Sequence, residues 1–119
     1  YCPWTGICVN GLGTLGENIG DLAGLEIAYA AWKMSLNGKV APVIDGQTGD
    51  QRFFLAYARS YRGKVREELA RAMLDGDSHA PNRYRVNGVV RNMDAWYAAF
   101  NIQPGDKLYL PPNERVRLW

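Results

Sequence analysis

Histidine and cysteine are scarce in this chain, and their scarcity limits the metal chemistry that it can hold by itself. Its 119 residues include a single histidine, His79, and two cysteines, Cys2 and Cys8. Structural zinc sites usually take four ligands, chiefly cysteine and histidine. Two cysteines with no neighbouring histidine supply too few ligands, so we do not expect them to form a metal site.

Long apolar runs and a strong excess of charge are also absent. No apolar stretch approaches the roughly 20 residues that a membrane-spanning helix needs, so no span is predicted. The 14 basic and 12 acidic side chains leave a net charge of +2, which is too small to indicate a nucleic-acid partner. The basic segment RSYRGKVREELARAM is interrupted by Glu67 and Glu68, and we interpret it as a solvated helix face rather than a nucleic-acid site.

What is present is an ordinary globular composition, with 47% hydrophobic and 22% charged residues, which fits one domain. The chain begins at Tyr1 rather than Met and shows no signal-peptide pattern, so we expect it to be a piece of a longer protein. Cys2 and Cys8 flank a turn-forming segment, CPWTGIC. A small disulfide loop, in an oxidising compartment, and a pair of free thiols are equally compatible with this spacing.

Hydrophobic periodicity predicts a mainly α-helical chain. Asn37-Gly38 suits the end of the first helix, and Asp50 is a candidate N-cap for the second. Residues 75–88 are rich in Gly, Pro and Asn and predict an irregular segment, while Pro111 and Pro112 predict an extended tail. Helices are predicted over residues 17–36, 51–61, 64–74 and 93–102.

Two acids, Glu17 and Asp21, lie one helical turn apart in the segment TLGENIGDLAGL. A capping box explains Glu17 alone, because Thr14 followed three residues later by Glu is its usual pattern. That explanation does not reach Asp21, whose side of the helix carries small residues instead of charges (Gly20, Gly24, Ala28 and Ala31). We therefore expect this stripe to be packed, and a buried carboxylate there needs a cation as its partner.

Four ordered blocks of the sequence resemble the neprilysin and endothelin-converting-enzyme family of zinc metallopeptidases. They are NGLGTLGENIGDLAGLEIAYAAW, DQRFFLAYARSYRGKVREE, DSHAPNRYRVNGVVRNMDAWYAAFNIQPGD and the terminal RVRLW. The resemblance implies the C-terminal helical part of a thermolysin-like (gluzincin) zinc peptidase catalytic domain. Arg62, Ile102 and Val116 stand where the animal members carry cysteines, which favours a bacterial relative.

The resemblance also assigns roles. Glu17 matches the third zinc ligand, and Asp21 matches the acid that hydrogen-bonds a zinc-binding histidine. His79 matches the histidine that stabilises the oxyanion of the transition state, with Asp77 as its orienting partner. Further residues match substrate-binding positions: the fork of Arg85 for a backbone carbonyl, and Tyr61, where many members have tryptophan, for the wall of a side-chain pocket.

The family's H-E-x-x-H motif supplies two further zinc ligands and the general base, and a chain with one histidine cannot contain it. Residues 1–119 are thus expected to be a C-terminal segment of the catalytic domain, inactive alone, with the H-E-x-x-H-bearing part of the same protein as partner. We therefore expect peptide substrates and one zinc ion in the full enzyme. We also expect export to the periplasm, cell surface or exterior, and self-association of the isolated piece. The alternative is a helical binding module without catalysis.

Overall fold

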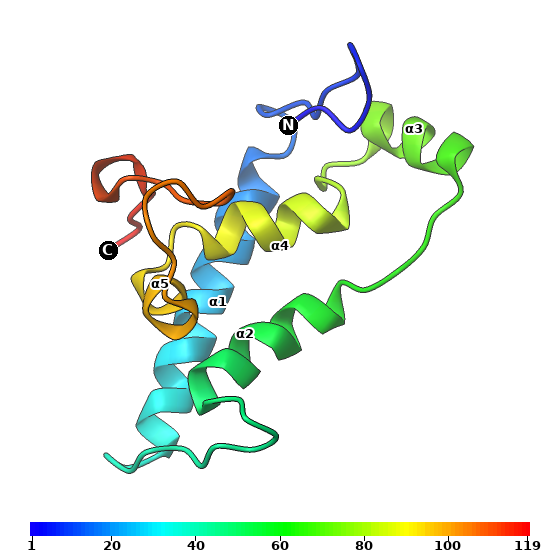
Figure 1. The fold of residues 1–119 in the computed structure, drawn as a ribbon. Coiled ribbons are helices and arrows are strands. Elements are labelled where there is room, and N and C mark those ends of the chain that lie inside the picture. Colours follow the sequence, from blue (N-terminus) through cyan, green and yellow to red (C-terminus); the bar gives the residue numbers. More distant parts are fainter.

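The computed structural model describes all 119 residues and contains five α-helices, one short 3-10 helix and no β-strand. The mainly α prediction is therefore confirmed. No helix is long and apolar enough to cross a membrane. In chain order the elements are α1 (Leu15–Ser35), α2 (Gly49–Ser60), α3 (Glu67–Gly76), α4 (Asn82–Val90), α5 (Asp94–Phe100) and the 3-10 helix η1 (Pro112–Glu114) (Figure 1).

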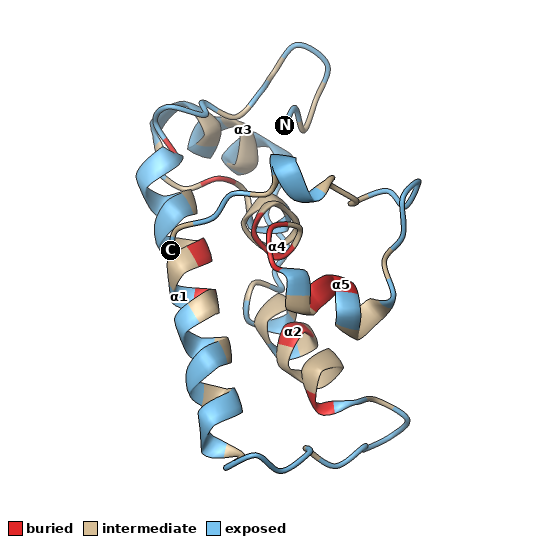
Figure 2. Cartoon of the chain, turned by 90° about the vertical axis from the view of Figure 1, so that its left-hand side faces the viewer, coloured by how far each residue is buried: buried red, intermediate tan, exposed pale blue.

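The core lies where α1, α2, α4 and α5 meet. Helix α1 packs against α4, and α2 packs against both α5 and α4. Phe54 is the most buried of the core side chains, at 2% exposure, and contacts the rings of Tyr29 and Phe53. Figure 2 shows the buried positions on the inner sides of these helices. The core cluster consists of Leu22, Leu25, Phe54, Val89, Val90, Met93, Trp96 and Tyr97.

The ends of the first two helices follow local chemistry. Asn37 and Gly38 both adopt positive φ just after α1, which confirms the predicted helix end at Asn-Gly. The predicted cap of α2 was wrong, because Thr48 rather than Asp50 is its N-cap. The Thr48 hydroxyl accepts a hydrogen bond from the backbone N–H of Gln51, whose side chain in turn accepts from the backbone N–H of Thr48.

Helix α4 occupies residues that the sequence predicted to be irregular. Pro81 precedes its first residue, a position where proline costs no hydrogen bond, and the backbone N–H groups of Tyr84 and Arg85 donate to the Pro81 carbonyl. Val89 and Val90 at its other end are buried in the core. Tertiary burial therefore outweighs the poor helix propensity of the Asn, Gly and Val residues in this segment.

The C-terminal tail is fastened to α5. Arg115 and Arg117 both form ion pairs with Asp94, in the first turn of α5. The N-cap of α5 is Met93, and the side chain of the preceding Asn92 accepts a hydrogen bond from the backbone N–H of Val116. The tail is not wholly extended, because η1 begins at Pro112, where a missing N–H is harmless.

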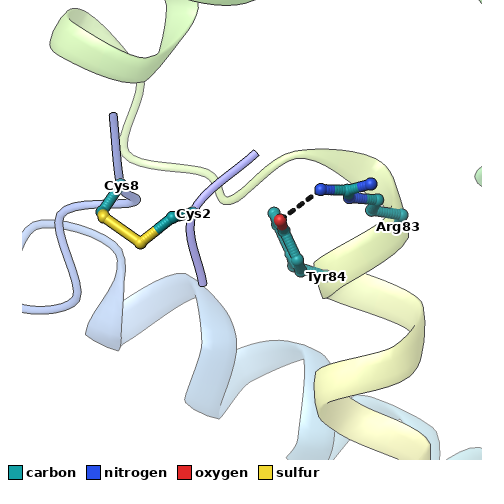
Figure 3. Close-up of a disulfide and its surroundings, with 4 residues drawn as sticks. All are labelled: Cys2, Cys8, Arg83 and Tyr84. Atoms are coloured by element: carbon teal, nitrogen blue, oxygen red, sulfur yellow. Dashed lines mark hydrogen bonds between the residues drawn. A yellow bond between two sulfur atoms is a disulfide. The ribbon is translucent and has the colours of Figure 1, made fainter. Parts of the chain in front are cut away.

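A disulfide between Cys2 and Cys8 closes the N-terminal loop (Figure 3). Tyr1 stacks on Tyr84 of α4 with ring centroids 4.8 Å apart. Trp4 lies under the guanidinium of Arg71 on α3, 4.5 Å from the ring centroid. The loop therefore contacts both α4 and α3, the helix that stands apart from the others in Figure 1.

The small-residue stripe of α1 is not packed within this chain. Its four residues are all exposed, and nothing lies within 4 Å of a Cβ built on Gly20 or Gly24. The same side of α1 carries the exposed apolar side chains of Ile27 and Met34. The radius of gyration, 15.7 Å, exceeds the roughly 13.5 Å expected for a compact chain of this length. One long face of α1 thus has no partner here.

We predict that the isolated 119-residue chain self-associates through this face, because water-exposed apolar area favours association. Sedimentation velocity at rising concentration should show dimers or larger species. Ile27→Glu places a charge in the middle of the face and should reduce association, whereas Asn113→Glu adds the same charge on the exposed η1 and should not. A clean monomer of the unmodified chain at high concentration would contradict the prediction.

We also predict an acid-sensitive contribution to stability from Asp94. Its hydrogen bonds with Arg117 and then Arg115 lower the pKa of this carboxyl group. A carboxyl group with a lowered folded-state pKa stabilises the fold above its unfolded pKa, and that stabilisation is lost as pH falls through the folded pKa. In Asp94→Asn the free energy of unfolding should therefore fall less steeply as the pH is lowered. Urea titration at several acidic pH values measures this dependence. Asp75→Asn, which removes no ion pair, should leave the pH dependence unchanged.

Candidate functional site

An ion pair joins the first helix to the fourth. Asp21 of α1 accepts two hydrogen bonds from Arg85 of α4, one from Nε and one from Nη2, each 2.7 Å long. The two side chains are largely buried, with 10% of Asp21 and 19% of Arg85 exposed. The hydrogen bonds with Asp21 are the main cause that raises the pKa of Arg85 above its ordinary value. Asp21 therefore has the cationic partner that its burial required, as the sequence predicted.

Two tyrosines of the α2 end support this pair. The Tyr61 hydroxyl donates to Asp21 Oδ1 at 3.2 Å, and the Arg85 guanidinium lies over the Tyr61 ring, 5.0 Å from its centroid. One turn earlier, the Tyr57 hydroxyl donates to the backbone carbonyl of Arg85 at 3.1 Å. Burial is the main cause that raises the pKa of both tyrosine hydroxyls, and the nearby charge of Asp21 adds to it. Both hydroxyls therefore remain protonated donors near neutral pH.

The single histidine lies between two carboxylates. His79 Nε2 is 2.9 Å from Glu17 Oε2, and His79 Nδ1 is 2.8 Å from Asp77 Oδ1. The same Asp77 oxygen accepts a hydrogen bond from the backbone N–H of His79. This hydrogen bond is the main cause that lowers the pKa of Asp77. Glu17 and Asp21 are one turn apart on α1, so this cluster and the Asp21–Arg85 pair are neighbours. The structure thus brings together four predicted site residues: Glu17, Asp21, His79 and Arg85.

The capping box considered for Glu17 is not formed. The Thr14 hydroxyl makes no cap hydrogen bond to the helix backbone, donating instead to the Asn10 carbonyl and accepting from the Asn18 side chain. The Glu17 carboxylate reaches His79 rather than the Thr14 backbone. Helix capping therefore does not account for the acid at this position.

A cavity of about 300 Å³ opens beside this cluster, with Asp77, His79 and Arg85 among its polar lining residues. Sequence reasoning did not identify this cavity, because one wall comes from the N-terminal loop. Tyr57 was also missed as a site residue, although its i, i+4 spacing from Tyr61 places the two on one side of α2. The apolar lining of the cavity is formed by Trp4, Val65, Ala70, Met73, Leu74 and Ala80.

The metal-binding capacity of the chain alone is limited. The structure contains no group of three or more His, Cys, Asp or Glu side chains that could hold a metal ion. The Glu17 side chain is 46% exposed, and one of its two oxygens contacts His79, so the other is free to serve as an oxygen ligand. A zinc ion accepts such a carboxylate oxygen as one ligand among several. The free oxygen of Glu17 therefore suits one zinc ligand, but these residues do not form a complete zinc site.

Comparison with known proteins now identifies the class. The sequence pattern described as Peptidase family M13 matches residues 1–116. The chain therefore belongs to this family, the neprilysin family of zinc metallopeptidases, and the resemblance is confirmed.

Bacterial and animal proteins are both among the relatives. The neutral endopeptidase of Lactobacillus helveticus is 36% identical over 93% of this chain, and human neprilysin is 35% identical over 93%. The structure superimposes with a TM-score of 0.91 on the zinc metalloprotease of Mycobacterium tuberculosis in its open state, at 53% identity over 93% of this chain. The matched region is 16%, 15% and 17% of those three proteins, so this chain spans a small part of their length.

We predict that breaking the Asp21–Arg85 pair destabilises the chain far more than breaking an exposed pair of the same kind. Asp21→Asn leaves a largely buried guanidinium without its counter-charge, which should cost about 3 kcal/mol in the free energy of unfolding. Glu67→Gln breaks the exposed Glu67–Arg71 pair on α3 and should cost about 0.5 kcal/mol or less. Urea unfolding of both variants measures the difference. Equal costs for the two substitutions would contradict the prediction.

Proposed function

We propose that these 119 residues form the C-terminal segment of the catalytic domain of a zinc metalloendopeptidase, downstream of an H-E-x-x-H helix carried by another part of the same protein. Three features of the chain support the proposal. The family match covers almost the whole chain, the free oxygen of Glu17 suits one zinc ligand, and the small-residue stripe of α1 has no partner within the chain. The observation that carries the proposal is the clustering of Glu17, Asp21, His79 and Arg85.

In this proposal Glu17 is the third zinc ligand, and zinc when bound polarises the scissile carbonyl as a Lewis acid. His79 donates an N–H to the negative charge that develops on the substrate oxygen. Asp77 fixes the orientation of the imidazole, because its carboxylate accepts the Nδ1 proton. Donation from Nε2 at the same time uses the imidazolium form, in which both ring nitrogens carry a proton.

Arg85 binds a backbone carbonyl of the peptide. Its Nε and Nη2 atoms are held by Asp21, and Nη1 has no partner within the chain, so this nitrogen is the donor left for substrate. Asp21 keeps the guanidinium in place. Its two oxygens accept three hydrogen bonds here, which leaves acceptor capacity for the N–H of a zinc-binding histidine, the role proposed from the family.

Peptides are the proposed substrates. The proposed partner is the H-E-x-x-H-bearing part of the same protein, packed on the small-residue stripe of α1. We also propose that the protein is exported to the periplasm, cell surface or exterior. The Cys2–Cys8 disulfide supports this location, since such bonds persist in oxidising compartments.

Two substitutions in the full-length protein separate the roles of zinc binding and transition-state stabilisation. Glu17→Gln should release zinc and abolish peptide hydrolysis, because a neutral amide is a poor zinc ligand. His79→Phe should retain zinc while kcat falls about 100- to 1000-fold, the usual effect of losing one oxyanion donor. Zinc content by elemental analysis and steady-state kinetics give both readouts. Glu68→Gln, an exposed acid without an ion-pair partner on α3, serves as the control and should change neither.

The alternative of a helical binding module without catalysis makes the opposite prediction. Full-length wild-type protein would then bind peptides without cleaving them, whatever its zinc content. Stoichiometric zinc in the Glu17→Gln variant would exclude Glu17 as a ligand.

A further inference from the structure

Tyr61 contacts both members of the Asp21–Arg85 pair in this structure. Its hydroxyl is committed to Asp21, and one face of its ring is covered by the guanidinium of Arg85. The wall of a side-chain pocket, which the family resemblance implies for this residue, stays a prediction. These contacts place the Tyr61 ring against the face of the Arg85 guanidinium.

The geometry of these contacts restricts how the guanidinium can turn. The two hydrogen bonds to Asp21 fix one edge of the planar group, and the tyrosine ring lies against its face. Asp21 is itself held, because the Tyr61 hydroxyl bonds Oδ1, the same oxygen that accepts from Arg85 Nη2. Without that hydroxyl the carboxylate would keep its two arginine bonds but lose its tie to α2.

The backbone of Arg85 is held from the same helix. Tyr57, one turn before Tyr61, donates its hydroxyl to the Arg85 carbonyl, and the rings of the two tyrosines meet edge to face with centroids 5.2 Å apart. Arg85 is therefore supported at both ends, at its backbone by Tyr57 and at its guanidinium by Tyr61. A residue held at both ends presents its remaining donor, Nη1, in one direction.

We propose that Tyr61, assisted by Tyr57, is a positioning residue that directs Arg85 Nη1 at the substrate carbonyl. The inference rests on the proposed function, which assigns that carbonyl to Arg85. Preorganised donors bind a ligand more tightly because less orientation is lost on binding. Since the carbonyl contact is made in both the ground state and the transition state, loosening Arg85 weakens substrate binding more than it slows the chemical step.

The experiment compares Tyr61→Phe and Tyr57→Phe with Tyr109→Phe in the full-length enzyme, using steady-state kinetics on a peptide substrate. Tyr109 is partly buried, and its hydroxyl makes no hydrogen bond, so its removal controls for loss of a phenol group. Tyr61→Phe should raise KM about fivefold, roughly the value of one hydrogen bond, with kcat changed less than twofold. Tyr57→Phe should act in the same direction, and Tyr109→Phe should change neither constant.

A second measurement separates positioning from general loss of structure. In an Arg85→Ala background, Tyr61→Phe should have no further effect on KM, because the group that it positions is gone. An unchanged KM for Tyr61→Phe in the wild-type background, or an equal rise in both backgrounds, would overturn the inference while leaving the proposed function intact. A wild-type enzyme that holds zinc but cleaves no peptide would overturn the proposed function and this inference with it.

Discussion

The pair between Asp21 and Arg85 is the interaction on which the arrangement of the site depends. The two residues are 64 positions apart in the chain, and their contact fixes the middle of α1 against α4. Burying two charges is costly, and the cost is offset only when the geometry is good and the remaining polar atoms are satisfied. Here two short hydrogen bonds and a tyrosine hydroxyl meet that requirement. The pair is therefore expensive to break rather than a large net source of stability.

Given this contact, helical geometry sets the relative positions of the other site residues. Glu17 precedes Asp21 by one turn on α1, and His79 lies in the loop that enters α4, a short distance before Arg85. Once α1 and α4 are in register, Glu17 and His79 meet without any further constraint. Asp77 then orients the imidazole from within the same loop.

The need for a cation beside the two acids was predictable from a local pattern, whereas the roles of His79 and Arg85 were predictable only through the family resemblance. Two acids one turn apart on a small-residue helix required a cation, and the structure supplies Arg85. Helix α4 was not predictable from its composition, because its stability comes from valines buried against distant segments. The positioning role of Tyr61 was equally inaccessible, since the sequence places an aromatic residue there but does not show which polar atom its hydroxyl reaches.

The exposed stripe of α1 is a further case in which tertiary context decides. Small residues at regular helical spacing indicate close packing, yet nothing in these 119 residues covers Gly20 or Gly24. In our account the covering element is the helix that bears H-E-x-x-H. A partner at that face would complete the zinc site and bury the uncharged surface at the same time.

The most direct test of this account is the mass of the native gene product, combined with peptide mapping of whatever lies upstream of Tyr1. The account predicts a protein several times larger than 13.3 kDa, with an H-E-x-x-H motif among the mapped upstream peptides. A native product that contains no such motif would contradict it. The acids of α1 would then need a function other than zinc-dependent peptide hydrolysis.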